Sequence, residues 1–151
     1  MEKGTQEQLW QDLIVDHSQF PHRQGRLEAA THSGEGENPL CGDRVRLYLD
    51  IDHDDLIRSA RFEATGCAIS LASASMLADA VEGLGRDQAQ SLFERTRALL
   101  TGQASDSVVP KGDLQALQLV SRYPLRVKCA SLCWHVLNSA LSGRSEPVST
   151  E

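Results

Sequence analysis

The sequence lacks any long apolar run, and this limits where the chain can work. No stretch approaches the ~20 apolar residues of a membrane-spanning helix, although 40% of the 151 residues are apolar. The first eight residues are polar and lack the apolar core of a secretory signal peptide. The expected compartment is therefore the cytoplasm, and we expect no membrane partner.

Dense positive charge is also missing. The net charge is -6, from 15 basic and 21 acidic residues, and the basic residues form no stripe that would hold nucleic-acid phosphates. We therefore expect no nucleic-acid partner. No internal repeat is visible, and this length suits one domain with its own hydrophobic core.

Cysteines are few, and none forms a C-x-x-C pair. That absence excludes the spacing typical of zinc fingers and zinc ribbons. Two disulfides are not expected in a reducing compartment. Metal binding or a reactive thiol is the better hypothesis for a cytosolic chain. The four residues concerned are Cys41, Cys67, Cys129 and Cys133.

Periodicity predicts an α+β fold. Alternating apolar residues over 44–52 indicate a half-buried strand, followed by a turn and a second strand over 56–64. Two strands followed by a helix are typical of an antiparallel sheet with helices packed on it. We expect a small antiparallel sheet of about three strands against about five helices. Further expected elements are helices at 6–19, 68–81, 87–100, 114–122 and from 124 to before Gly143, a short strand at 25–31, and loops at 32–39 and 101–112.

The expected domain covers residues 1–143, and residues 144–151 are expected to form a disordered C-terminal tail. Within the domain, three cysteines lie where turns or loops lead into regular elements. Cys67 follows Gly66 at a strand-to-helix junction, where the free N–H groups of the helix lower a thiol pKa. Cys129 lies in the first turns of the last helix, beside basic residues, and Cys41 lies on a loop.

A carboxylate completes this set. Asp43 follows Cys41 closely enough for both side chains to reach one ion. Three thiolates and one carboxylate match a tetrahedral metal site, and Arg126 and Lys128 would offset its negative charge. An oxygen ligand is more labile than a fourth thiolate. This favours a metal site that can open and expose a thiol when a partner binds. The alternatives are ordinary buried thiols and an aspartate that only caps a turn.

Three motifs together resemble one known family. They are Asn-Pro-Leu-Cys-Gly-Asp at 38–43, Gly-Cys-Ala-Ile-Ser-Leu-Ala-Ser-Ala-Ser at 66–75, and Arg-Val-Lys-Cys at 126–129. In this order they resemble the NifU N-terminal/IscU/SufU family of iron–sulfur cluster assembly proteins. The match spans roughly residues 9 to 142, and several ordered motifs together are more specific than any one of them.

Two features resemble the SufU branch of that family. Lys128 precedes the third cysteine of the motifs, where IscU-like members usually have histidine. The long stretch 84–125 resembles an insertion that SufU-like members carry. In two places the chain departs from the family pattern: His22 follows Pro21 where many relatives have arginine, and Cys133 is an additional thiol.

The resemblance implies zinc as cofactor, with Cys41, Asp43, Cys67 and Cys129 as its ligands. It implies a SufS-type, pyridoxal-phosphate-dependent cysteine desulfurase as partner, alongside other cluster-assembly proteins. The implied role is a sulfurtransferase-like acceptor of persulfide sulfur on Cys41, not a stand-alone enzyme. One alternative is a scaffold that holds an iron–sulfur cluster or Fe²⁺ on the same cysteines. Another is a zinc-stabilised interaction module.

The remaining candidates are given structural roles. Cys133 follows Cys129 by one helical turn, so it could be a resolving thiol or an alternative ligand, but core packing is the favoured interpretation. His17 is expected to make a hydrogen bond from a helix face, and His22 is given no role. The serines at 70, 73 and 75 indicate close helix packing, because no Ser–His–acid arrangement is visible.

Overall fold

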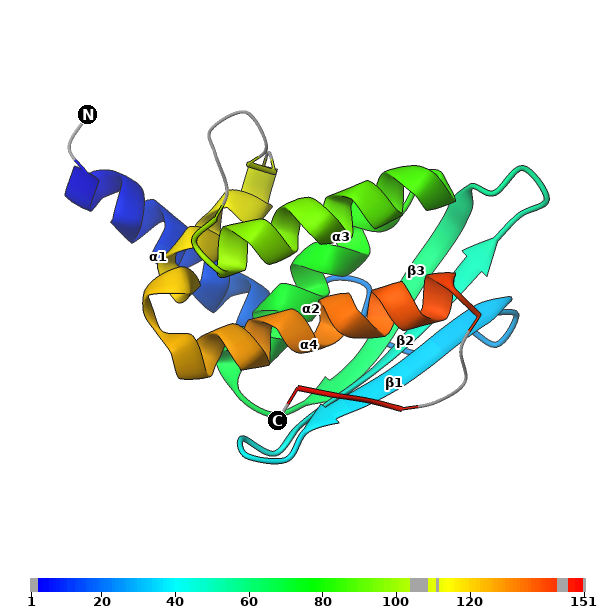
Figure 1. Ribbon diagram of the computed structural model, residues 1–151, viewed down its shortest axis with the longest axis horizontal. Coiled ribbons are helices and arrows are strands. Elements are labelled where there is room, and N and C mark those ends of the chain that lie inside the picture. The colour runs from blue at the N-terminus through cyan, green and yellow to red at the C-terminus, as the bar shows by residue number, and fades with distance from the viewer. Residues whose placement is uncertain (1–2, 104–108, 111, 144–146, 151) are drawn as a thin grey trace.

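A computed structural model of the protein describes residues 3–103, 109–110, 112–143 and 147–150. The α+β prediction is confirmed, since one sheet and the helices pack together (Figure 1). No helix in these ranges is long and apolar enough to cross a membrane. The elements in chain order are α1 (Lys3–Gln19), β1 (His32–Asn38), β2 (Asp43–Ile51), β3 (Ile57–Thr65), α2 (Ala68–Val81), α3 (Arg86–Leu100), the 3₁₀ helix η1 (Gly112–Arg122), α4 (Pro124–Leu141) and β4 (Val148–Ser149).

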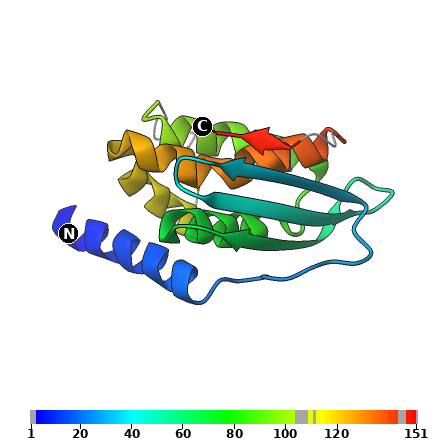
Figure 2. The same ribbon diagram turned by 90° about the horizontal axis from the view of Figure 1, so that it is seen from below.

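The sheet has the strand order β3-β2-β1-β4. β1 and β3 both pair antiparallel with β2, and the short β4 pairs parallel with β1. Helices α2 and α4 pack on one face of the sheet, α1 packs against α2 and η1, and α3 packs against α4 (Figures 1 and 2). The sheet thus has the predicted antiparallel strands β2 and β3, but its third antiparallel strand, β1, is not at the predicted residues 25–31, and the short parallel β4 is additional.

The hydrophobic core lies between the sheet and these helices. The predicted alternation in β2 is confirmed, because Val45, Leu47 and Leu49 are all buried. They pack with large side chains of neighbouring elements, among them Phe62 of β3 and Trp134 of α4, both fully buried. Burial of this apolar surface is the main favourable contribution to folding.

β1 is the largest difference from the expected organisation, because residues 32–39 were predicted to be a loop. Glycine is depleted in strands, yet β1 contains Gly34 and Gly36. A Cβ on Gly36 would lie 2.8 Å from a methyl carbon of Val136, and one on Gly34 would lie 3.1 Å from the Val136 carbonyl oxygen. The close approach of α4 therefore requires glycine in this strand, and tertiary packing overrides propensity.

Two other segments differ from the prediction. Residues 25–31 form turns and bends instead of a strand, and the nearest pairing is an isolated bridge between Gln24 and Phe62. In the expected disordered tail, residues 148–149 instead form β4, and the Thr150 N–H donates to the Glu37 carbonyl at 3.3 Å. Residues 144–146 and 151 of that tail lie outside the described residues.

Candidate metal centre

The predicted site residues come from three connections at one end of the sheet. The turn between β1 and β2 carries Cys41, and Asp43 is the first residue of β2. Cys67 is the N-cap residue of α2, directly after β3, and Cys129 lies in the first turns of α4. Figure 1 shows the β1–β2 turn, the β3–α2 connection and the beginning of α4 at this same end.

Asp43 lies among the three thiols. One ligand atom from each of Cys41, Asp43 and Cys129 lies within 4.8 Å of the other two. Cys67 adjoins this group through Asp43, since its Sγ lies 4.0 Å from Asp43 Oδ2 and its backbone N–H donates to Oδ1 at 2.9 Å. The structure therefore brings Cys41, Asp43 and Cys129 together, while Cys67 lies beside them and joins the group only through its contacts with the buried Asp43 carboxylate.

Gly66 makes room for that carboxylate. Its φ angle is +133°, a conformation that residues with a side chain rarely adopt. A Cβ at this position would lie 2.2 Å from Asp43 Oδ1 and 2.8 Å from the Asp43 Cα. The glycine before Cys67 is thus required both by the backbone turn and by the position of Asp43.

The electrostatics of the group favour a cation. Cys129 is fully buried, and burial raises the pKa of its thiol strongly, with Asp43, Cys41 and Cys67 raising it further. Anionic groups this close cannot all be charged unless positive charge compensates them. Arg126 supplies part of this positive charge. A hydrogen bond to Cys129 and attraction to Cys67 and Cys41 raise the pKa of its guanidinium, which shows that its charge is close to the thiols. A bound divalent cation would supply the rest.

Asn38 belongs to the same site and was missed as a functional candidate. It is buried, its Nδ2 lies 3.9 Å from Cys129 Sγ, and its carbonyl accepts from the Cys41 N–H at 3.2 Å. Its Oδ1 is buried with no hydrogen-bond partner among the described residues. The available signal was its position at the start of the motif that contains Cys41.

The four thiols differ in access to solvent. Cys41 is exposed, Cys67 is half-buried, and Cys129 and Cys133 are buried. The packing interpretation of Cys133 is confirmed, because it belongs to the hydrophobic core and its Sγ lies 3.3 Å from Ser73 Oγ. Burial raises the pKa of the Cys133 thiol to about 12. Within the site, Cys41 is therefore the thiol that another protein reaches most easily.

Three thiols and a carboxylate at one end of this fold define a candidate centre for a zinc- or iron-like metal. Residues 9–142 match the family model described as the NifU-like N terminal domain. The chain belongs to this family.

Named relatives include SufU, the branch that the sequence features favour, and IscU. The chain is 37% identical to the zinc-dependent sulfurtransferase SufU of Bacillus subtilis, over 89% of this chain and 90% of the relative. It is 34% identical to the iron–sulfur cluster assembly scaffold protein IscU of Streptococcus pyogenes, over 88% and 82%. A solved structure from Fervidobacterium islandicum, titled a putative scaffold protein for the SUF system, matches with a TM-score of 0.79 at 34% identity, covering 86% of this chain and 94% of that one.

Proposed function

We propose that the protein is a zinc-bound sulfur acceptor that works with a SufS-type cysteine desulfurase in iron–sulfur cluster assembly. The observation that carries this proposal is the difference in exposure among the clustered thiols. Cys41 is open to solvent while Cys129 is fully buried. A purely structural site gains nothing from an exposed ligand, whereas a sulfur acceptor requires one.

The donor set fits zinc. Cys41, Asp43, Cys67 and Cys129 would hold the ion, which would keep the thiols deprotonated at neutral pH. Because burial raises the pKa of the Cys129 thiol, zinc would have to displace its proton, and the positive charge of Arg126 near the thiols would favour that exchange. Zinc also agrees with the name of the Bacillus subtilis relative.

The chemical step is thiol exchange. The Cys41 thiolate attacks the outer sulfur of a persulfide on the desulfurase cysteine. A new S–S bond forms at Cys41 Sγ while the S–S bond of the desulfurase persulfide breaks, and its electron pair leaves with the desulfurase cysteine as a thiolate. One thiolate is consumed and one is released, so the transfer needs no external oxidant or reductant.

Exposed apolar side chains surround the same end of the molecule. Leu40 precedes Cys41, and Tyr123 and Leu125 lie where α4 begins; each is at least 60% exposed. Exposed apolar residues grouped beside a reactive side chain are typical of protein interaction sites. We infer that this surface, together with Arg126, receives the desulfurase.

The test is Cys41→Ser, with Cys133→Ser as the matched control. Cys41→Ser is expected to stay folded, with a melting temperature lowered no further than chelation lowers that of the wild type, and to abolish stimulation of sulfide release by a SufS-type desulfurase given cysteine. Cys133→Ser should retain both the metal and the stimulation. A folded Cys41→Ser protein that still stimulates the desulfurase would exclude Cys41 as the acceptor, and an unfolded one would favour the zinc-stabilised module.

A scaffold is the second candidate, because thiolates also hold iron–sulfur clusters and the Streptococcus pyogenes relative is named a scaffold. The cluster would then be cargo assembled on Cys41, Cys67 and Cys129. Metal analysis of protein purified without reconstitution separates the two. About one zinc per chain supports the acceptor, whereas bound iron with sulfide supports the scaffold.

A further inference from the structure

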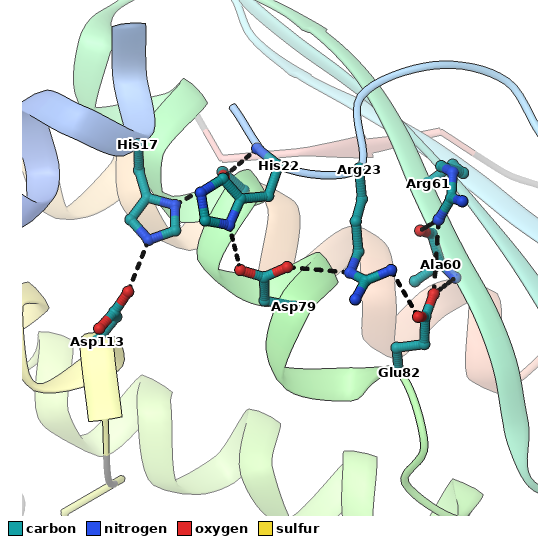
Figure 3. Close-up of polar contacts among 9 residues, drawn as sticks. His17, His22, Arg23, Ala60, Arg61, Asp79, Glu82 and Asp113 are labelled. Atoms are coloured by element: carbon teal, nitrogen blue, oxygen red, sulfur yellow. Dashed lines mark hydrogen bonds and ion pairs between the residues drawn. The ribbon is translucent and has the colours of Figure 1, made fainter. Parts of the chain in front are cut away.

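A second group of possible metal ligands contains no cysteine (Figure 3). It joins His17 of α1, His22 of the following connection, and Asp79 of α2. Cys67 caps the N-terminus of α2, whereas Asp79 lies about 18 Å further along the helix at 1.5 Å per residue. The second group is therefore separate from the candidate metal centre.

The three side chains lie close enough to share one ion. One ligand atom from each lies within 4.8 Å of the other two. The two imidazole rings have centroids 4.4 Å apart, and His22 Nδ1 lies 2.5 Å from Asp79 Oδ2. His17 has only 3% of its side chain exposed, while His22 has 52% and Asp79 has 36%. The group is thus closed on the side of His17 and open to solvent at His22 and Asp79, where an ion can enter.

Asp113 orients the buried histidine. His17 Nε2 lies 2.9 Å from Asp113 Oδ2 (Figure 3), and its Nδ1 lies 2.7 Å from Ser75 Oγ. Because a carboxylate can only accept, Nε2 carries a proton and Nδ1 accepts from the Ser75 hydroxyl. That hydroxyl must turn away before the Nδ1 lone pair can bind a metal. Histidines that bind metals usually donate their other ring N–H to a carboxylate or carbonyl in this way.

Ser75, His17 and Asp113 also form a Ser–His–acid series, which the sequence did not reveal. It has no access for a substrate, because Ser75 is fully buried. Its Oγ already accepts from the His22 N–H at 2.7 Å. The structural interpretation of Ser75 is therefore retained, and the hydroxyl serves to hold His17 and the His22 backbone together.

Ionic contacts also hold the second carboxylate oxygen of Asp79, Oδ1. Arg23 Nε donates to Asp79 Oδ1 at 3.0 Å, and Arg23 Nη1 lies 2.5 Å from Glu82 Oε1 (Figure 3). Glu82 is itself fixed by the Ala60 N–H at 3.0 Å and by Arg61 at 3.5 Å. Because Arg23 pairs with both Asp79 and Glu82, it neutralises the Asp79 carboxylate only in part. Asp79 Oδ2, which Arg23 does not contact, can therefore still bind a cation.

We propose that His17, His22 and Asp79 form a second metal site for a divalent transition-metal ion, with water filling the remaining positions. Two imidazoles and one carboxylate suit Zn²⁺ and Fe²⁺. The ion replaces the proton between His22 Nδ1 and Asp79 Oδ2. Metal–ligand bonds of about 2.0–2.2 Å require these two atoms to move apart, which their partial exposure allows. A bound ion ties α1 and the connection after it to α2.

The test uses the full-length chain, preloaded with one equivalent of zinc and then titrated with Zn²⁺ by calorimetry. A second equivalent is expected to bind in the wild type, and His22→Gln and Asp79→Asn are each expected to weaken it by more than about tenfold. Asp113→Asn should also weaken it, by about 10- to 100-fold, because it removes the carboxylate that orients His17. His53→Gln is the matched control, since His53 is an exposed histidine on the β2–β3 turn.

A second readout does not depend on the variants folding. In the wild type, the ring proton resonances of both His17 and His22 should shift in NMR spectra as the second equivalent binds. The proposal is overturned if no second equivalent binds, if it binds the His22→Gln and Asp79→Asn variants as tightly as the wild type, or if neither histidine resonance shifts. Binding that is lost equally in His53→Gln also overturns it.

Discussion

At the scale of single residues, Asp43 is the side chain that joins the candidate metal centre together. It is fully buried, accepts the Cys67 N–H, and lies within 4.8 Å of the ligand atoms of Cys41 and Cys129. A buried carboxylate is costly unless its charge is compensated. Its contacts therefore go beyond capping a turn, because it adjoins all three thiols of the candidate centre.

Gly66→Ala should damage metal binding through this carboxylate. The added Cβ would lie 2.2 Å from Asp43 Oδ1, and the φ of +133° is strained for alanine. We expect a loss of about 1–3 kcal/mol in the free energy of unfolding and weaker zinc affinity, measured by competition with a chelator. Gly42→Ala is the matched control, because Gly42 also has a positive φ, of +68°, but a Cβ there meets nothing within 4 Å. Wild-type zinc affinity in Gly66→Ala would contradict the assignment of Asp43.

Cys133 should make stability fall at alkaline pH. Burial raises its pKa to about 12 in the folded protein, from a reference value of 9.0. Above pH 9.0 the unfolded chain therefore loses this proton while the folded protein keeps it, so the unfolded state is favoured increasingly as pH rises. The free energy of unfolding should decline more steeply above this pH in the wild type than in Cys133→Ala. Parallel declines in urea denaturation series would show that the thiol is not protonated in the fold.

At the scale of elements, a helix or strand could be predicted when its own pattern of apolar residues shows which face is buried. It could not be predicted when its residues are explained only by contact with a distant segment. The alternation in β2 and the apolar helices report burial directly, so residues 44–52 and 68–81 were placed almost to the residue. β1 was missed because its glycines are explained only by contact with Val136 in α4. Such a contact between distant segments leaves no local pattern.

The same difference between local pattern and distant contact applies to the cysteine site and to the histidine cluster. Cys41, Asp43, Cys67 and Cys129 lie in short ordered motifs, which made them recognisable. The histidine cluster was not recognisable, because the partners of its members are distant in sequence. His17 meets Asp113 of η1, and His22 meets Asp79 of α2. A histidine whose partner lies on another element cannot be distinguished from a surface histidine by spacing alone.

The contact between α2 and α4 should depend on one buried serine. Ser73 Oγ donates to the Ala130 carbonyl at 2.7 Å and accepts from Trp134 Nε1 at 3.0 Å. Ser73→Ala leaves both groups buried without this partner, so we expect a loss of about 1–3 kcal/mol in denaturant unfolding. Ser70→Ala is the control, because the buried Ser70 hydroxyl has no hydrogen-bond partner among the described residues. Removing it should be neutral or stabilising, and equal losses in both variants would contradict the role of Ser73.

At the scale of the whole molecule, the candidate metal centre borders the hydrophobic core, and Cys129 is fully buried where the two meet. The core cluster joins the sheet to α2, α3, α4 and η1, and in the described part of the chain it includes none of Cys41, Cys67 and Cys129. The centre occupies the connections at one end of the sheet (Figure 1). The core cluster therefore supplies stability that does not depend on a metal, as the proposed sulfur acceptor would require.

Removing the metal should accordingly loosen one end of the molecule without unfolding it. A ligand that binds only the folded state stabilises it by about 4 kcal/mol when its free concentration is roughly a thousand times its Kd, so chelation should lower the melting temperature. Far-UV circular dichroism should stay unchanged, because the core is intact. Hydrogen exchange should quicken at residues 38–43 and 66–70 and at the beginning of α4, where the repulsion among Asp43 and the three thiols is no longer compensated. Global loss of helical signal on chelation would instead identify a zinc-stabilised module, since metal binding would then supply the folding free energy itself.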